Sequence, residues 1–300
     1  MKKFILNCIY FIIPFIVYVI IVLIINPYNY ENFQCVQLPH KEKIAKSVEP
    51  HLFKIIDFEN NPTSNILLGD SRSNSLALEI KSTKWSNLAY GGGSLKEVIE
   101  TFWWAKDIVK LDTVLVGINL NLYNKYNKRF WVEETLELKK NIFSYAFSRH
   151  TSKATFLNIK SMFIEEEISL HKTKMSKDKF WRYQLNVTGP KFYTHFAYPT
   201  EYYRDLKEIS QYCIKNDIKL IFWVPPTHID FQKIKNDHNL EELDKKFISD
   251  LNTLGKVYNF DIDSNITRNA DNFRDPMHFD REVGLMVFSD LFSNTNYLYD

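Results

Sequence analysis

The sequence predicts an α/β fold of three layers, in which helices cover both faces of a central, mostly parallel β-sheet. Short β-rich runs alternate along the chain with stretches of helical period, and this alternation is typical of a parallel sheet with crossover helices. The composition agrees, because 300 residues with 45% hydrophobic and 15% aromatic content suffice for one large core. A long uncharged segment at the N-terminus predicts one further element, a transmembrane helix.

Five short apolar runs are the predicted strands, and the helical-period stretches that follow them are the predicted helices. The strands are expected at residues 65–68, 85–89, 113–118, 219–224 and 256–260, and the helices at residues 94–109, 201–215, 240–254 and 281–292. Ser94 is followed three residues later by Glu97, which is the spacing of a capping box at a helix start.

The first 30 residues predict a membrane anchor. Lys2 and Lys3 precede residues 4–25, which contain no charge and are long enough to cross a hydrocarbon core of about 30 Å. A secretory signal would have a shorter apolar region and small residues at a cleavage site, so an uncleaved anchor is favoured over it. The two lysines favour a cytoplasmic N-terminus and an extracytoplasmic remainder. A buried core helix is the alternative, although such helices rarely lack charge for so long.

The rest of the chain divides into a stalk or linker at residues 31–62 and one α/β domain at residues 63–300. The strand and helix alternation fails between about residues 121 and 198. We interpret this segment as a helical insertion, because a structureless loop of that length is improbable in a compact domain. Its most distinctive pieces are residues 127–131 and 177–183. Insertions after sheet strands commonly shape a binding cleft.

Charge and cysteine content exclude several classes of function. Lys2 and Lys3 are the only charged residues among the first 30, so the remainder is balanced, with 36 basic and 36 acidic residues. A nucleic-acid partner is therefore not expected, since no basic stripe is present. Cys8, Cys35 and Cys213 are widely spaced and give no metal-ligand pattern, and we expect neither metal nor cofactor. A bridge between Cys35 and Cys213 stays open.

The first candidate site follows the strand at residues 65–68, which runs directly into Gly69, Asp70 and Ser71. An acid and a hydroxyl at this place can simply cap a helix, because both accept bonds from free N–H groups. A nucleophilic serine would also need a base, a group that orients the base, and donors for an oxyanion. The sequence must therefore be searched for those partners.

Three other segments can supply the partners. Asp275 and His278 stand three residues apart, so one turn of chain can bring the carboxylate to Nδ1 of the imidazole and leave Nε2 free as a base. Residues 91–93 are three glycines just before the capped helix, where bare N–H groups can face a small anion. Gly117 and Asn119 end a strand at the sheet edge where ligands bind, and the amide of Asn119 can donate to an oxyanion. Each segment alone also fits a simple turn.

The four segments occur in the order Ser, Gly, Asn and Asp-x-x-His, and in this order the sequence resembles the SGNH, or GDSL-type, hydrolase superfamily. The resemblance covers roughly residues 63–295 and implies a three-layer flavodoxin-like fold. It implies Ser71 as nucleophile, His278 as base and Asp275 as its orienter, with an oxyanion hole made by the backbones of Ser71 and Gly92 and the side chain of Asn119. Many members follow the third-block Asn with Asp, whereas Leu120 stands here.

The anchor, the outward-facing domain and the insertion resemble the branch of this superfamily that modifies cell-surface polymers, which includes alginate O-acetylation proteins and the D-alanyl-lipoteichoic acid protein of Gram-positive envelopes. This resemblance implies a single-pass membrane protein that acylates or deacylates a surface glycan, glycolipid or teichoic-acid-like polymer through an acyl-serine. A multi-pass membrane acyltransferase is an expected partner. The alternative is a non-catalytic assembly or carrier-binding protein that retains the fold.

Several further residues are candidates for substrate contact. Arg72 follows the proposed nucleophile, and Trp223 and His228 lie in residues 222–228 after the fourth strand, which should reach the same rim. Tryptophans can stack on sugar faces, although aromatic residues usually form core. The tryptophans weighed in this way, of which at least one of the first two is expected to pack, are Trp103, Trp104, Trp131 and Trp181.

Overall fold

The fold was examined in a computed structural model that describes residues 1–33, 36–77, 84–163 and 175–293. The chain forms two compact units. Unit 1 comprises Met1–Pro62 and Trp131–Lys172, and unit 2 comprises Thr63–Phe130 and Thr173–Asp300. Cys35 lies outside the described residues, so its pairing with Cys213 is not tested.

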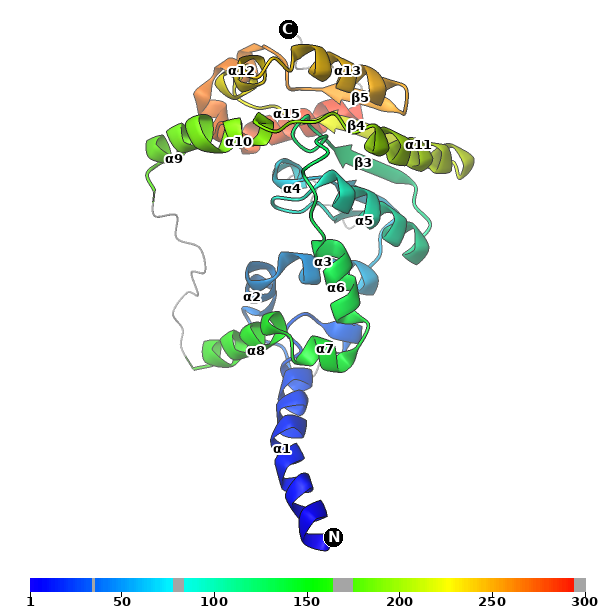
Figure 1. Cartoon of the computed structure of the whole chain (residues 1–300), viewed down its shortest axis with the longest axis vertical. Coiled ribbons are helices and arrows are strands. Elements are labelled where there is room, and N and C mark those ends of the chain that lie inside the picture. Colours follow the sequence, from blue (N-terminus) through cyan, green and yellow to red (C-terminus); the bar gives the residue numbers. More distant parts are fainter. Residues whose placement is uncertain (34–35, 78–83, 164–174, 294–300) are drawn as a thin grey trace. The chain divides into compact units, whose positions relative to one another are not determined.

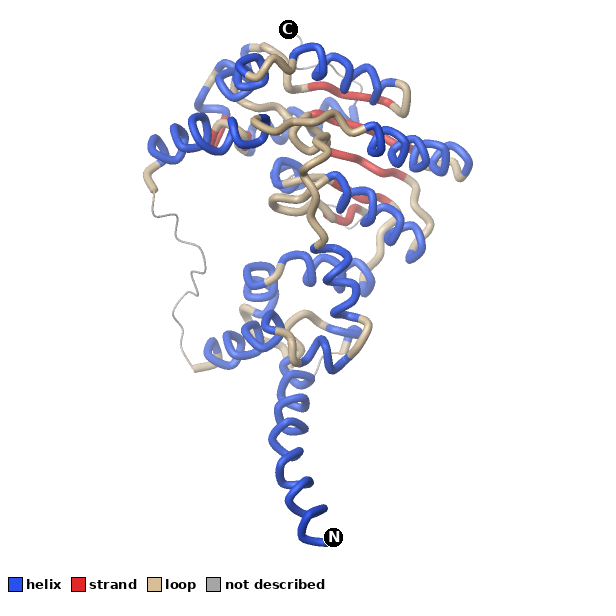
Figure 2. Tube along the Cα trace, in the orientation of Figure 1, coloured by secondary structure: helices blue, strands red, loops and turns tan. Residues whose placement is uncertain are grey.

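Unit 2 is built on a five-stranded sheet, seen edge-on as red segments in Figure 2. Its strands are β1 (Asn65–Leu68), β2 (Trp85–Asn87), β3 (Thr113–Gly117), β4 (Lys219–Val224) and β5 (Lys256–Asn259). They pair in the order β2-β1-β3-β4-β5, and every pair is parallel. Because the order reverses between β1 and β3, the carboxyl ends of these two strands form the switch point where such sheets bind ligands. The predicted α/β fold with its parallel sheet is confirmed.

Helices cover both faces of this sheet, as expected for strands buried on both sides. Leu67, Leu115 and Ile221 share one face and pack with Val283 and Val287 of α15. Residues that alternate with them point to the opposite face, where α5 and α11 pack on each other and on the sheet (Figure 1). The helices of unit 2 are α4 (Ser71–Ala77), α5 (Leu95–Ile108), α9 (Lys177–Tyr183), α10 (Gly189–Tyr193), α11 (Thr200–Lys215), α12 (Ile229–Asp237), α13 (Glu241–Asn252), α14 (Asn265–Arg268) and α15 (Arg281–Ser293).

Three short pieces complete unit 2. A π-helical turn, Gln184–Thr188, joins α9 to α10, and a 3-10 turn, Ala270–Asn272, follows α14. Next come β6 (Phe273–Asp275) and β7 (His278–Phe279), which form a separate antiparallel pair. The expected capping box at α5 is present, because Ser94 Oγ accepts from the Glu97 N–H and Glu97 Oε2 accepts from the Ser94 N–H. The sequence did not predict the antiparallel pair.

Unit 1 contains the long N-terminal helix α1 (Lys2–Ile25). Its stretch from Leu6 to Ile25 is long and apolar enough to cross a membrane, and only 11% of that stretch is buried, whereas a core helix would be mostly buried. The C-terminal end of α1 is different, because Val22 and, just after the helix, Tyr28 are buried in the core of unit 1. Asn26 adopts a left-handed conformation that ends the helix, and its side-chain amide donates to the carbonyl of Tyr30.

The remaining helices of unit 1 come from two distant segments. These elements are a 3-10 turn (Tyr30–Asn32), α2 (Lys41–Val48), α3 (Pro50–Asn60), α6 (Trp131–Lys139), α7 (Ile142–Ala146) and α8 (Arg149–Ser161). The rings of Tyr30 and Tyr145 stack with centroids 4.4 Å apart, and Lys139 forms an ion pair with Glu59.

This structure differs from the predicted boundaries in two ways. Residues 31–62 were expected to be a stalk, but α2 and α3 contribute Ile44, Leu52 and Ile56 to a hydrophobic core. The segment 121–198 is helical as expected, yet its middle part joins unit 1 while both of its ends remain in unit 2. The physical reason is that each segment has an apolar face that the other covers.

Candidate active site

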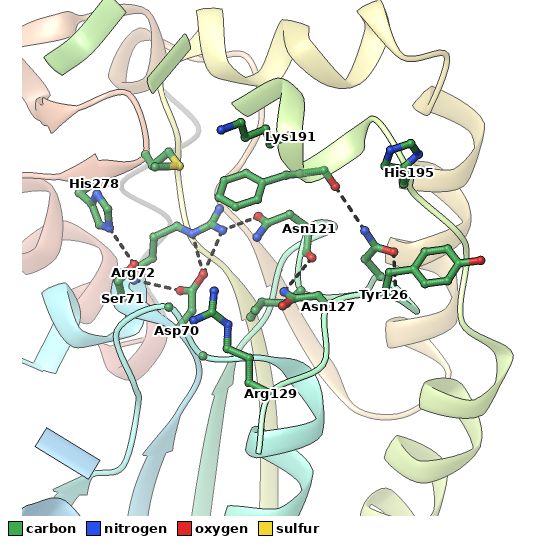
Figure 3. A pocket seen from close by; sticks show the side chains of 16 residues that line it. Asp70, Ser71, Arg72, Asn121, Tyr126, Asn127, Arg129, Lys191, His195 and His278 are labelled. Carbon is green, nitrogen blue, oxygen red and sulfur yellow. Dashed lines mark hydrogen bonds and ion pairs between the residues drawn. The ribbon is translucent and has the colours of Figure 1, made fainter. Parts of the chain in front are cut away.

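The stretch Gly69–Ser71 turns sharply from β1 into α4, and both candidate roles of its polar residues are present. Asp70 Oδ1 accepts from the backbone N–H of Arg72 at 2.9 Å and so caps the start of α4. Ser71 does not cap. Its Oγ lies 2.8 Å from Nε2 of His278, 207 residues further along the chain (Figure 3).

The imidazole of His278 is held by a hairpin of two short strands. Asp275 and His278 face each other across the β6–β7 pair, with Pro276 and Met277 between them. Both carboxylate oxygens of Asp275 lie 2.9 Å from Nδ1 of His278, and Oδ1 also accepts from the Met277 N–H at 3.0 Å. Burial would raise the pKa of Asp275, but the hydrogen bonds from His278 and Met277 outweigh it and lower that pKa. The carboxylate therefore stays ionised and keeps a proton on Nδ1.

Two glycines allow the strand ends beside Ser71 to come together. A β-carbon on Gly69 would lie 2.6 Å from the carbonyl oxygen of Gly117 and 2.2 Å from Ser73 Oγ. Gly69 also has a φ of +139°, a conformation that residues with a β-carbon rarely adopt. On Gly117 a β-carbon would lie 2.8 Å from Nε1 of Trp223. The glycines that end β1 and β3 thus fix where Ser71 stands.

Ser71 and His278 open onto a pocket of about 360 Å³. Figure 3 shows this pair at one end of the pocket and His195 and Tyr126 at the other. The residues that line the pocket are Asp70, Ser71, Arg72, Gly92, Gly93, Asn121, Leu122, Asn124, Tyr126, Asn127, Arg129, Lys191, Phe192, His195, Met277 and His278.

Beneath Ser71 the charge of Asp70 is balanced in a buried network. Asp70 Oδ2 accepts from Nε of Arg72 at 3.0 Å and lies 2.9 Å from its Nη2. The same oxygen accepts from Nδ2 of Asn119 at 3.0 Å, and Arg72 Nη2 donates to Oδ1 of Asn121 at 2.5 Å. Charge-assisted bonds of this kind are strong and hold their members rigidly. Arg72 lines the pocket as expected, but its charge is neutralised by Asp70.

Asn119 does not lie where it was predicted. It is 3% exposed, its amide donates to Asp70, and its Oδ1 accepts from the Leu122 N–H at 3.1 Å. The pocket is lined instead by Asn121, two residues further on. The reason is electrostatic, since a buried carboxylate is a stronger acceptor for the Asn119 amide than an uncharged site would be. Asn119 therefore positions Asp70 rather than facing the pocket.

Gly92 lines the pocket, in agreement with its expected location. Its φ of +69° lies in the left-handed region that favours glycine, and a β-carbon there would lie 3.6 Å from a guanidinium nitrogen of Arg129. Within the described residues, the N–H groups of Ser71 and Gly92 donate to no protein acceptor. Both groups are therefore available to a ligand.

Two candidates for substrate contact are core residues instead. Trp223 is fully buried and packs edge-on against Phe260 and Phe279, because it lies on the sheet face that α15 covers. His228 is buried, caps α12 through Nδ1, and packs edge-on against Trp181. Burial lowers the pKa of His228 despite the nearby Asp230. The tryptophans that were weighed as sugar platforms, Trp103, Trp104, Trp131 and Trp181, are also absent from the pocket lining.

The sequence reasoning missed the far side of the pocket, which we call the distal wall and define as Tyr126, Lys191 and His195. All three side chains are exposed. Lys191 and His195 flank the end of α10, and Tyr126 lies in the loop after β3, so the wall comes from the two ends of the segment 121–198. The signal that could have indicated it is the polar run at 119–129, with Asn at 119, 121, 124 and 127.

Arg129 also lines the pocket, between the distal wall and Ser71 in Figure 3. Together with Arg72 and Lys191, it gives the lining three cationic side chains, and the imidazoles of His195 and His278 also line the pocket. Asp70 is the single carboxylate of the lining, and it is paired with Arg72. Over the described parts of the chain, no group of three or more His, Cys, Asp or Glu side chains could hold a metal ion.

Comparison with known proteins gives similarity to solved structures only. No family model matches the chain, and no curated protein matches it. A protein described as an acylhydrolase from Bacteroides fragilis is 12% identical with a TM-score of 0.39, covering 77% of this chain and 84% of its own. A GDSL-like lipase from Bacteroides thetaiotaomicron is 9% identical with a TM-score of 0.39, covering 77% and 85%.

A third structure, described as a platelet activating factor from Streptococcus pneumoniae, is 10% identical with a TM-score of 0.42 and covers 84% of this chain and 94% of its own. Similarities of this size say nothing about which reaction the pocket of this chain supports. The chemistry must follow from its own side chains.

Proposed function

We propose that this protein is a serine esterase or acyltransferase of the SGNH type that acts through an acyl-serine intermediate. The observation that carries the proposal is the continuous hydrogen-bonded chain from Ser71 through His278 to Asp275. A nucleophile, a base and a group that orients the base are the parts that acyl transfer by a serine requires. Ser71 comes from the turn after β1 and the other two from the β6–β7 hairpin, and Ser71 and His278 line one pocket.

The reaction follows from this geometry. Ser71 Oγ attacks the carbonyl carbon of an ester while its proton passes to Nε2 of His278, and the positive imidazolium is stabilised by the carboxylate of Asp275. His278 then gives that proton to the leaving alcohol, and the ester bond breaks. Water or a sugar hydroxyl next attacks the carbonyl carbon of the acyl-serine while its proton passes to Nε2 of His278. The bond from the acyl carbon to Ser71 Oγ then breaks as His278 returns that proton to Oγ, which completes hydrolysis or transfer.

The oxyanion of each tetrahedral intermediate needs fixed donors. The backbone N–H groups of Ser71 and Gly92 are the donors that we assign, because both residues line the pocket and neither N–H has an acceptor among the residues that the structure describes. Asn121 replaces Asn119 as the candidate for a side-chain donor. Asn121 lines the pocket, and the hydrogen bond from Arg72 to its Oδ1 fixes the orientation of its side-chain amide. Loss of one such donor typically costs about 3 kcal/mol of barrier.

The lining supports a substrate that carries negative charge near its ester. Arg129 and Lys191 are cationic, and the one carboxylate of the lining is paired with Arg72. An acidic cell-surface polysaccharide, glycolipid or teichoic-acid-like polymer meets this requirement. The length and apolar composition of α1 support a membrane anchor for this enzyme. Lys2 and Lys3 before it favour a cytoplasmic N-terminus and so an extracytoplasmic unit 2. A multi-pass membrane acyltransferase is the partner that this proposal includes.

A serine-reactive fluorophosphonate probe tests the proposal on the full-length protein in detergent. The probe should label the wild-type chain and should spare Ser71→Ala and His278→Ala variants of unchanged thermal stability. Equal labelling of all three would exclude this mechanism. No labelling of the wild type, together with binding of an acidic polymer, would instead indicate a non-catalytic carrier-binding protein.

A further inference from the structure

The helical pair α7–α8 of unit 1 contacts α1 in the middle of its apolar stretch rather than at its end. The hydroxyl of Tyr18 donates to the carbonyl of Ala146 at 2.8 Å and lies 2.6 Å from Ser152 Oγ. The ring of Phe147 packs on Tyr18 at 5.1 Å and on Phe15 at 6.3 Å, measured between ring centroids. Tyr18 lies seven residues before the end of α1, which is about 10 Å along the helix axis.

This contact limits where a bilayer can lie. If the whole of α7–α8 stood in water, only residues 4–17 of α1 would remain for the lipid, and they span about 21 Å. A hydrocarbon core is about 30 Å thick. The missing length is recovered if the loop between α7 and α8 enters the outer leaflet beside α1.

The outer surface of α7–α8 is apolar in a way that suits this position. Phe143 is 62% exposed and Phe156 is 66% exposed, although the same helices bury Tyr145 and Ala154 in the core of unit 1. Further bulky apolar side chains on this surface are Phe147, Met162 and Phe163. So many bulky exposed apolar side chains on two helices that contact each other exceed the scattered single ones of an ordinary soluble surface, and such a group marks an interaction site.

The charge of the same surface indicates what it binds. Residues 141–163 contain no acidic residue. Arg149, Lys153 and Lys160 are exposed at the spacing of one helix face, which they share with Phe156. Within the described residues, none of these three cations forms an ion pair. Aromatic side chains interleaved with long cationic ones are typical of a surface that lies at the boundary between acyl chains and anionic headgroups.

We propose that residues 141–163 form a lipid-facing surface that inserts Phe143, Phe147 and Phe156 into the outer leaflet and places Arg149, Lys153 and Lys160 at anionic phospholipid headgroups. The inference rests on α1 spanning the membrane, as in the proposed function, but not on the chemistry of Ser71. Unit 1 is then held to the bilayer by two elements instead of one.

The test places an environment-sensitive fluorophore on single cysteines of the full-length chain, with Cys8, Cys35 and Cys213 replaced by serine. The chain is reconstituted into vesicles of phosphatidylcholine and phosphatidylglycerol. A label at Phe156→Cys should show blue-shifted emission and should be quenched by lipids that carry a nitroxide on the acyl chain. A label at Ile214→Cys, an exposed apolar site on α11 of unit 2, should be red-shifted and unquenched.

A third label distinguishes the membrane-spanning helix α1 from the lipid-facing surface of residues 141–163. Ile16→Cys lies on the exposed side of α1 and should be quenched in the same way as position 156. Quenching at 16 but not at 156 would overturn the lipid-facing surface and leave the anchor intact, and no quenching at 16 would overturn both. A Lys153→Glu, Lys160→Glu double variant should shift the emission of the label at 156 to the red, and an unchanged spectrum would overturn the role of the cations. Labelling of Ser71 by the fluorophosphonate probe reports separately on the proposed function.

Discussion

The two ends of the pocket are built in opposite ways. At the catalytic end, Ser71, His278 and Asp275 come from strand ends and a pinned hairpin, and each polar group has a partner. The distal wall of Tyr126, Lys191 and His195 comes from loops and a short helix, and its side chains are exposed. In the proposed function, the sheet therefore positions the reacting groups, and the inserted segments supply the side chains that contact the substrate.

The largest effect is expected from removing the nucleophile or the base. Ser71→Ala and His278→Ala should each lower kcat for ester hydrolysis by about 10⁴-fold or more, because the two groups act as a unit. Hydrolysis of p-nitrophenyl acetate by the full-length protein measures the loss. Ser73→Ala is the matched control, since its buried Oγ has no hydrogen-bond partner among the described residues. Equal losses in both serine variants would mean that folding, not chemistry, had failed.

Replacing the group that orients the base should have the next largest effect. Asp275→Asn should lower kcat by roughly 10³- to 10⁴-fold, because an amide oxygen does not stabilise the imidazolium as a carboxylate does. The pKa of Asp275 is lowered in the folded state, so its ionised form stabilises the fold above the unfolded pKa, roughly 3.9. That stability is lost as the pH falls through the folded pKa.

Thermal unfolding of the wild type and of Asp275→Asn should therefore give a higher melting temperature for the wild type at neutral pH. The difference in melting temperature should shrink below about pH 4. A difference that persisted unchanged in acid would show that the carboxylate of Asp275 is not the source of the stability.

Asn119 tests the role of the network beneath Ser71, because its side chain donates to Asp70 and does not line the pocket. Asn119→Ala should lower the free energy of unfolding by about 1–3 kcal/mol, since Asp70 loses a charge-assisted donor in a buried site. Chemical denaturation measures this loss. Asn252→Ala, at an exposed site on α13, is the control and should change stability little. If Asn119→Ala left stability unchanged but removed activity, Asn119 would be a direct oxyanion donor after all.

The smallest effect is expected at the distal wall, and it should depend on the substrate. Lys191→Gln should raise KM for an ester with a neighbouring phosphate or carboxylate by roughly five- to tenfold, as expected for a partly exposed bond to a charged group. KM for a neutral ester of the same acyl group should not change. Lys215→Gln on α11 provides an exposed lysine away from the pocket. A uniform rise in KM for both esters would remove the case for an anionic substrate.

The residues at the Ser71 end of the pocket could be predicted from the sequence, because each segment that contributes to it has a local sequence pattern. An apolar run that ends in Gly69 and Ser71 indicates a strand end, and a carboxylate three residues before His278 can reach it within one turn. The bounds of the five strands of the parallel sheet were predicted to within two residues for the same reason. The roles of these residues in catalysis stay predictions until activity is measured.

The remainder depends on distant contacts that no local pattern contains. Asn119 and Asn121 have the same residue type and follow the same strand, and only the path of the loop decides which one faces the pocket. Trp223 lies on the covered sheet face, which its position near the rim did not reveal. The helices α2 and α3 looked like a polar stalk because the segment that covers their apolar face begins about 70 residues later.

The burial of Val22 and Tyr28 in unit 1 has a practical consequence for the preparation of a water-soluble form of the protein. Cutting the chain at residue 31 would remove part of a hydrophobic core together with the apolar stretch of α1, so the product should expose apolar surface and aggregate. A better design deletes unit 1 entirely and joins residues 63–130 to residues 173–300 with a flexible linker. Residues 1–30 look dispensable in the sequence, yet their removal alone should destabilise the rest of unit 1.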